Sequence, residues 1–137
     1  MIPPGRPALL QAHRRSENSM RVGVIGAGAF GTALSNLLAS RGHSVKLWAY
    51  EAEVALAINE RHENALYLPG ISLAADLRAT GDLAEAVDRA ELVLLAVPSH
   101  VARAIVRQLA PLLPASIPIV TVAKGIENES LLTMTEV

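Results

Sequence analysis

The sequence predicts an α/β fold in which helices cover both faces of a parallel sheet. Two observations support this prediction. Short apolar segments alternate with segments of helical periodicity along residues 20–137, which is the pattern of successive βαβ units. The run from Leu92 to Val97 is continuously apolar, as in strands that are covered on both faces. Right-handed crossovers then give a doubly wound sheet in three α/β/α layers, with the expected strand order 3-2-1-4-5.

The N-terminal half is expected to hold two strands and two helices. Apolar runs over residues 21–25 and 44–50 predict the strands. Residues 29–41 predict a helix that stops at Gly42, and residues 52–61 predict the second helix. The first helix has apolar residues at helical spacing, and they form the face that we expect to pack on the sheet: Phe30, Ala33, Leu34, Leu37 and Leu38.

A less regular connection leads into the third strand. Residues 62–76 contain the turn signal Pro69-Gly70, and a short strand is expected near residues 77–80. Asp82 and Glu85 then have the spacing of a capping box, which predicts that a helix begins there.

The C-terminal part is expected to add two strands and two helices. Residues 92–97 and 117–122 predict the strands, and Ser99 is placed to cap the helix between them. A last helix is expected to begin near Glu129. The helix after Ser99 should bury four apolar residues: Val101, Ala104, Ile105 and Leu109.

Length and composition narrow the function classes. The 137 residues fit one domain, which we place at residues 20–137 after a flexible extension over residues 1–19. Twelve basic and 13 acidic residues leave no electrostatic footprint for nucleic acid. The chain has no cysteine, and no apolar run approaches the length of a membrane span, so we expect a cytoplasmic protein without membrane insertion.

A glycine-rich turn joins the first strand to the first helix. It reads Gly26-Ala27-Gly28-Ala29-Phe30-Gly31, and this G-x-G-x-x-G pattern has a strand before it and a helix after it. The first glycine permits the tight turn, the second lets backbone approach a pyrophosphate, and the third lets helix and strand pack closely. The phosphate would meet free N–H groups at the positive end of the helix. The pattern therefore predicts a Rossmann-like dinucleotide site.

The end of the second strand bears on the choice of cofactor. Glu51 lies about twenty residues beyond Gly31, where an acid can bond the ribose hydroxyls of NAD. The alternative interpretation of Glu51 is a solvated acid that the helix dipole favours. Tyr50 is neutral and no cation follows the strand directly, so we expect NAD to be favoured over NADP.

Three other side chains are candidates for a role in binding or chemistry. Lys124 follows the last strand, where a lysine could contact a substrate oxygen or a phosphate, or could be an ordinary surface lysine. His100 is expected to be an exposed first-turn residue, and Phe30 is expected to pack mostly in the core, with part of its ring walling the pyrophosphate site. The histidines show no metal-ligand spacing and no Ser-His-Asp arrangement, so we expect no metal site.

Several motifs together resemble the NAD(P)-dependent glycerol-3-phosphate dehydrogenases. The similarity covers nearly all of residues 20–137, far more than the glycine turn alone. The matching segments are Gly26-Ala27-Gly28-Ala29-Phe30-Gly31-Thr32-Ala33-Leu34, Gly42-His43-Ser44-Val45-Lys46-Leu47-Trp48, Ile58-Asn59, Asn64-Ala65-Leu66-Tyr67-Leu68-Pro69-Gly70-Ile71, Val97-Pro98-Ser99 and Ala123-Lys124-Gly125-Ile126-Glu127.

The resemblance implies an oxidoreductase that interconverts sn-glycerol 3-phosphate and dihydroxyacetone phosphate with NAD or NADP. In bacterial-type members this reaction supplies phospholipid synthesis. The resemblance further implies that Lys124 binds both the small-molecule substrate and the cofactor, and it is compatible with a homodimer. The cofactor contacts implied by the resemblance, together with those proposed above from the residues, are Gly26, Gly28, Ala29, Phe30, Gly31, Tyr50, Glu51, Val101 and Lys124.

This chain departs from the family pattern in its extent. Members continue into a helical C-terminal domain that carries the acid–base lysine, so we expect an incomplete cofactor domain, no catalytic residue within this chain, and no turnover by the chain alone. Two other interpretations of the sequence stay open. The chain could be a stand-alone dinucleotide-binding or regulatory module, or part of another Rossmann-type reductase.

Overall fold

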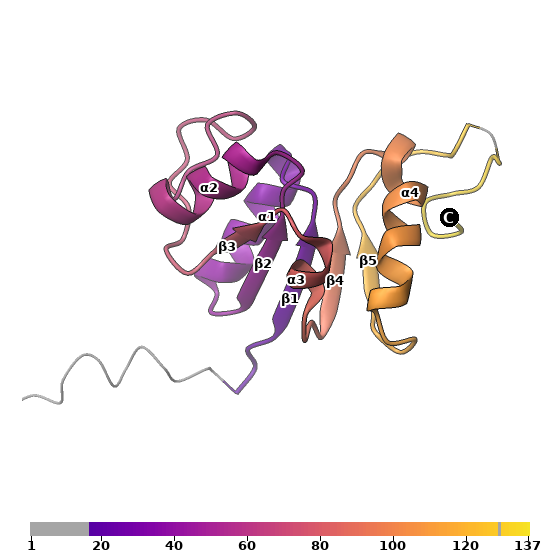
Figure 1. Ribbon diagram of the computed structural model, residues 1–137, viewed down its shortest axis with the longest axis horizontal. Helices are drawn as coiled ribbons and strands as arrows, with labels where there is room; N and C mark the ends of the chain where they lie inside the picture. Colours follow the sequence, from indigo (N-terminus) through magenta and orange to yellow (C-terminus); the bar gives the residue numbers. More distant parts are fainter. Residues whose placement is uncertain (1–16, 129) are drawn as a thin grey trace, which may run out of the picture.

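Five parallel strands form one sheet, in the predicted order β3-β2-β1-β4-β5 (Figure 1). The computed structural model describes residues 17–128 and 130–137, so most of the extension predicted over residues 1–19 lies outside the described residues. The strands are β1 Arg21–Ile25, β2 Ser44–Trp48, β3 Arg78–Thr80, β4 Leu92–Leu95 and β5 Ile119–Thr121. The helices are α1 Ala29–Ser40, α2 Ala52–Arg61, α3 Leu83–Val87 and α4 Ser99–Leu109, and a 3₁₀ turn follows at Ala110–Leu112.

Several strands are shorter than the apolar runs that predicted them. Ile25, the last residue of β1, pairs with Trp48 of β2 and with Leu95 of β4. The central three strands therefore end in register, where β1 turns at Gly26. Beyond that line β2 and β4 give way to loops, although the sequence is still apolar at Ala49 and Val97.

The two faces of the sheet carry separate cores, which confirms the predicted α/β/α layers. Val24 and Leu47 point to the face that α1 and α2 cover, where they pack with Val54 and Ile58. Alternate residues point the other way, because successive side chains of a strand leave opposite faces. That second face packs against α3 and α4 through Ile25, Val93, Leu95, Ala86, Ala102 and Ile105.

The predicted buried face of α1 is wrong for most of its residues. Helix α1 rests on the sheet through small residues, namely Gly31, Thr32, Ser35 and Ala39. Phe30 and Leu37 are instead 59% and 52% exposed. A Cβ at Gly31 would lie 1.9 Å from the carbonyl oxygen of Gly26, so the helix approaches β1 too closely for bulky residues at the contact. This close approach turns Phe30 and Leu37 outward, whereas Leu38 is half-buried and packs against the core as predicted.

The ends of α1 and α3 agree only partly with the ends predicted from the sequence. Gly42 stops α1 as expected: its φ is 90° and its N–H donates to Ala39 O, while the His43 N–H donates to Leu38 O. Asp82 caps α3 through Ala84 N, but the Glu85 carboxylate accepts from the Thr80 hydroxyl rather than closing the capping box.

Helix α4 departs from its prediction at two points. It starts at Ser99 itself with Pro98 as its N-cap, so no serine side chain caps it. Its buried residues are Ala102, Ile105 and Leu109, whereas Ala104 is exposed and Val101 half-buried. The helix is therefore rotated so that Ala102, rather than Ala104, faces the sheet.

The helix predicted to begin near Glu129 is not formed by the described residues 130–137. The Glu127 N–H donates to Leu132 O, and the Leu131 N–H donates to Glu127 O, with Leu131 at a φ of 59°. Thr133 donates through both its N–H and its hydroxyl to the Glu136 carboxylate. The Val137 N–H donates to Thr133 O, so Thr133 and Glu136 have the contacts of a helix start, four residues later than predicted.

Candidate functional site

A cavity of about 840 Å³ opens at the carboxyl ends of the strands. It lies where the neighbouring strands β1 and β4 lead into helices on opposite faces of the sheet. In doubly wound sheets this switch point is where ligands bind. The loops that follow β1, β2, β4 and β5 line it. All nine predicted site residues lie along this cavity: Gly26, Gly28, Ala29, Phe30, Gly31, Tyr50, Glu51, Val101 and Lys124.

The three glycines of the turn after β1 meet different constraints. Gly26 has a φ of 117°, and a Cβ there would lie 2.6 Å from Ala96 O. Gly31 has no room for a Cβ because of its contact with Gly26 O. A Cβ at Gly28 would meet no atom within 4 Å, although Gly28 lines the cavity. Two glycines therefore serve packing, and Gly28 leaves space for a ligand above the backbone.

The amino end of α1 faces this space without a competing group. Gly28 is its N-cap, no side chain caps it, and no acidic residue lies in its first turn. The first N–H groups of a helix have no intrahelical partner and carry the positive end of its dipole. This end of the cavity can therefore hold an anion through backbone donors.

A buried amide that sequence reasoning missed fixes the glycine turn from behind. Asn64 is 1% exposed, and its Nδ2 donates to Ala27 O at 2.9 Å and to Thr32 Oγ1 at 2.8 Å. The Thr32 hydroxyl in turn donates to Ala27 O at 3.2 Å. The connection after α2 thus holds the turn in place. The family-matching segment from Asn64 to Ile71 was the available signal, but the bonding partners of Asn64 could not be read from the sequence.

Aromatic side chains line the cavity beside β2. Trp48 is buried, as predicted, and its Nε1 donates to Gly81 O at 3.0 Å. Tyr50 is 83% exposed and meets the Trp48 ring edge-on, with centroids 6.3 Å apart. Phe30 also lines the cavity, and its exposure corrects the expectation that most of its ring packs in the core.

Glu51 and Tyr67 form a pair at the rim. Glu51 is the N-cap residue of α2, but its carboxylate makes no capping bond to the helix. Instead it accepts a hydrogen bond from the Tyr67 hydroxyl. This bond, followed by desolvation and the charges of Glu51 and Glu53, raises the pKa of Tyr67 above its ordinary value. The tyrosine therefore stays a protonated donor at neutral pH.

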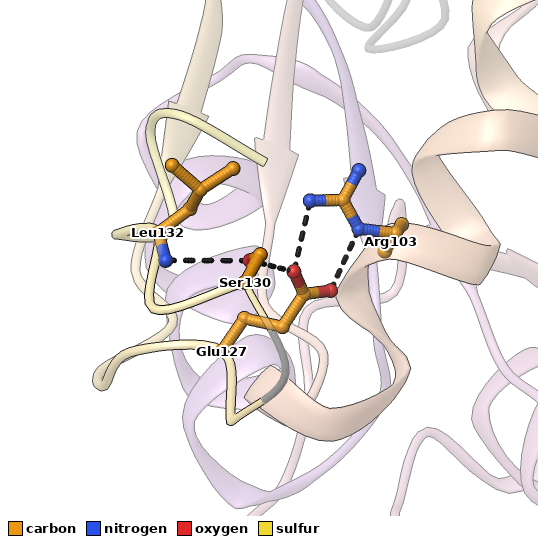
Figure 2. A network of polar contacts seen from close by, with 4 residues as sticks. All are labelled: Arg103, Glu127, Ser130 and Leu132. Atoms are coloured by element: carbon orange, nitrogen blue, oxygen red, sulfur yellow. Dashed lines mark hydrogen bonds and ion pairs between the residues drawn. The ribbon is translucent and has the colours of Figure 1, made fainter.

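Lys124 stands on the opposite wall, where it is exposed. Its loop is tied to α4, because Arg103 Nε and Nη2 donate to the two carboxylate oxygens of Glu127 at 2.7 and 2.8 Å (Figure 2). Ser130 also donates to this carboxylate and accepts from the Leu132 N–H. The bonds from Arg103 and then Ser130 lower the pKa of Glu127 to about 2.

The histidines stay apart from the cavity. His100 is exposed in the first turn of α4, as predicted, and does not line the cavity. His43 accepts the Met20 N–H, His62 ends α2, and His13 lies outside the described residues. Within residues 17–128 and 130–137, no group of His, Asp and Glu is placed to hold a metal ion. No described helix is long and apolar enough to cross a membrane.

The chain is similar to known proteins over nearly the same residues as the predicted domain, 20–137. Residues 21–137 match the model of the N-terminus of NAD-dependent glycerol-3-phosphate dehydrogenase. The chain is 55% identical over 117 residues to glycerol-3-phosphate dehydrogenase [NAD(P)+] of Myxococcus xanthus, covering 85% of this chain and 35% of that protein. For the same enzyme of Anaeromyxobacter sp. the identity is 50% over 118 residues, covering 86% and 36%.

A solved structure gives the same picture. The glycerol-3-phosphate dehydrogenase of Coxiella burnetii superposes with a TM-score of 0.79 at 30% identity, covering 86% of this chain and 36% of that one. The chain thus spans about a third of the length of the curated relatives it matches.

Proposed function

This chain belongs to the NAD-dependent glycerol-3-phosphate dehydrogenase family, to whose N-terminal part it corresponds, and we propose that it is the cofactor-binding part of such an enzyme. The reaction would interconvert sn-glycerol 3-phosphate and dihydroxyacetone phosphate with NAD or NADP, as a source of glycerol 3-phosphate for phospholipid synthesis. The bound nicotinamide would supply or accept the hydride.

The observation that carries this proposal is the free space above Gly28, beside the uncapped end of α1. A pyrophosphate fits such a cradle because backbone N–H groups can bond it and the helix dipole favours its charge. We assign this contact to Gly26, Gly28, Ala29, Phe30 and Gly31.

The remaining cofactor contacts would come from the other loops. Tyr50 and Glu51 would contact the adenosine end at the carboxyl end of β2, and Val101 would contact the dinucleotide from α4. Lys124, at the far end of the cavity, would hold an oxygen of the substrate and contact the cofactor. The acid–base lysine would belong to the part of the relatives that this chain does not cover.

Direct titration with NADH tests the proposal. Trp48 lines the cavity, so its emission and the energy transfer to reduced nicotinamide report occupancy. Gly28→Val should abolish binding while leaving the fold intact, because Gly28 has a φ of −69° and its Cβ would enter free space. Ala33→Val, on the exposed side of α1 and away from the cavity, is the matched control and should bind normally.

The possible results of the titration and of an activity assay test cofactor binding and turnover separately. A folded chain that binds neither NADH nor NADPH would contradict the cofactor site. Binding without reduction of dihydroxyacetone phosphate is the expected result for this chain alone. A measurable rate would contradict the placement of the acid–base group outside it.

Two finer points belong to the same proposal: the enzyme acts in the cytoplasm and assembles as a homodimer. Both rest on the family relationship. Sedimentation of the chain and of a longer gene product, compared at the same concentration, would test the dimer.

A further inference from the structure

We propose that Tyr67 is a positioning residue that makes the site select NAD over NADP, by holding the Glu51 carboxylate toward the adenosine ribose. This inference rests on the proposed function, since it names the specificity of that same site. It concerns the connection after α2, where the segment from Asn64 to Ile71 matches the family pattern without an assigned role.

The first step is the anchoring of Tyr67. Its N–H donates to Asn64 Oδ1 at 3.2 Å, and the next residue, Leu68, donates to Asn64 O at 2.8 Å. Asn64 is buried and bonded to Ala27 and Thr32 of the glycine turn and α1. The backbone of Tyr67 is therefore tied to the turn that would hold the pyrophosphate.

The second step is the state of Glu51. An acid at this position could simply cap α2, but the structure shows no capping bond from its side chain. The Tyr67 hydroxyl bonds one carboxylate oxygen, Oε1, and both residues line the cavity. The other oxygen is left as an acceptor for a ribose hydroxyl.

The third step is the charge around this position. Glu51 and Glu53 are both acidic, and Glu53 lies in the first turn of α2. Among the described residues that line the cavity, the cation is Lys124, which follows β5. Strands β1 and β4 separate β5 from β2 in the sheet. A 2′-phosphate would therefore meet negative charge without a nearby cation, whereas a free 2′-hydroxyl would find an acceptor.

The test measures dissociation constants for NADH and NADPH with the wild-type chain and with Tyr67→Phe. We expect the wild type to prefer NADH. Tyr67→Phe should weaken NADH binding about five- to tenfold, the effect of losing one oriented hydrogen bond, and change NADPH binding less than twofold. The preference for NADH would fall accordingly, while the melting temperature reports that the variant is folded.

Two further variants separate positioning from general damage. Glu51→Gln should remove the preference, and adding Tyr67→Phe to it should weaken NADH no further, because the two residues act as one unit. Glu53→Gln removes a neighbouring charge that does not line the cavity, and it should leave NADH affinity unchanged.

Each contrary result has a distinct meaning. If Tyr67→Phe weakens NADH and NADPH equally, or neither, while the wild type binds NADH, the role of Tyr67 is overturned and the proposed function stands. If the wild type prefers NADPH, the selectivity is overturned. If the folded wild type binds neither cofactor, both the proposed function and this inference fail.

Discussion

The cavity has a glycine wall, residues 26–31, and a lysine wall, residues 122–127, and different interactions hold them. The glycine wall is fixed by backbone contact at Gly31 and by the buried amide of Asn64. The residues of the lysine wall are all half-buried or exposed. Arg103 holds this wall through its ion pair with Glu127, and the two side chains are 33% and 20% exposed.

This difference indicates which of the two walls can open without unfolding of the domain. A wall that is built on close packing opens only when a large part of the domain unfolds, whereas a wall held by a partly exposed ion pair can open locally. The glycine wall is thus held rigidly, whereas the end of the lysine wall is tied to α4 through the polar cluster of Arg103, Glu127 and Ser130 (Figure 2).

The largest expected effect is a change in the packed part of the glycine wall. Gly31→Ala places a Cβ 1.9 Å from Gly26 O, so the backbone must shift. We expect a loss of about 3 kcal/mol in the free energy of unfolding. Gly28→Ala should change it by less than about 0.5 kcal/mol, because its Cβ meets no atom within 4 Å. Urea unfolding measures both, and equal losses would refute the distinction between the two glycines.

An intermediate effect is expected for the amide behind the glycine wall. Asn64→Ala removes the buried amide that donates to Ala27 O and to the Thr32 hydroxyl and accepts from the Tyr67 N–H, at a cost of about 2 kcal/mol in the free energy of unfolding. Asn128→Ala, an exposed amide next to the lysine wall, is the matched control and should change stability by less than about 0.5 kcal/mol. Thermal or urea unfolding checks the pair, and similar costs at both positions would erase the contrast between the walls.

The smallest effect on global stability is expected at the lysine wall. Arg103→Gln should lower the free energy of unfolding by less than Asn64→Ala does, because the ion pair is partly exposed. The local effect is larger: amide exchange in residues 122–137 should accelerate, while exchange in residues 22–32 stays unchanged. Equal acceleration in both segments would mean that the walls open together.

The pH dependence sharpens the same comparison. Folding lowers the pKa of Glu127 from 4.5 to about 2, so its stabilising contribution is present above pH 4.5 and is lost as the pH falls toward 2. An NMR titration of the Glu127 carboxyl should show a midpoint near 2 in the wild type and clearly higher in Arg103→Gln. An unchanged midpoint would show that Arg103 is not the cause.

Local patterns in the sequence were sufficient for much of the fold. The strand–glycine–helix order at residues 21–40, the stop at Gly42 and the strand order follow from periodicity, turn chemistry and crossover handedness. The same patterns located the cavity, because parallel strands must end at one edge of the sheet and the loops there must converge.

Tertiary structure decided what depends on contact between distant residues. Periodicity identified an apolar face on α1, but the close approach at Gly31 turned the opposite, small-residue face to the sheet and left Phe30 exposed. Asn64 reaches Ala27 across 37 residues, and Tyr67 reaches Glu51 across 16. A sequence shows which groups can form hydrogen bonds, whereas only the packed chain brings two such groups within bonding distance.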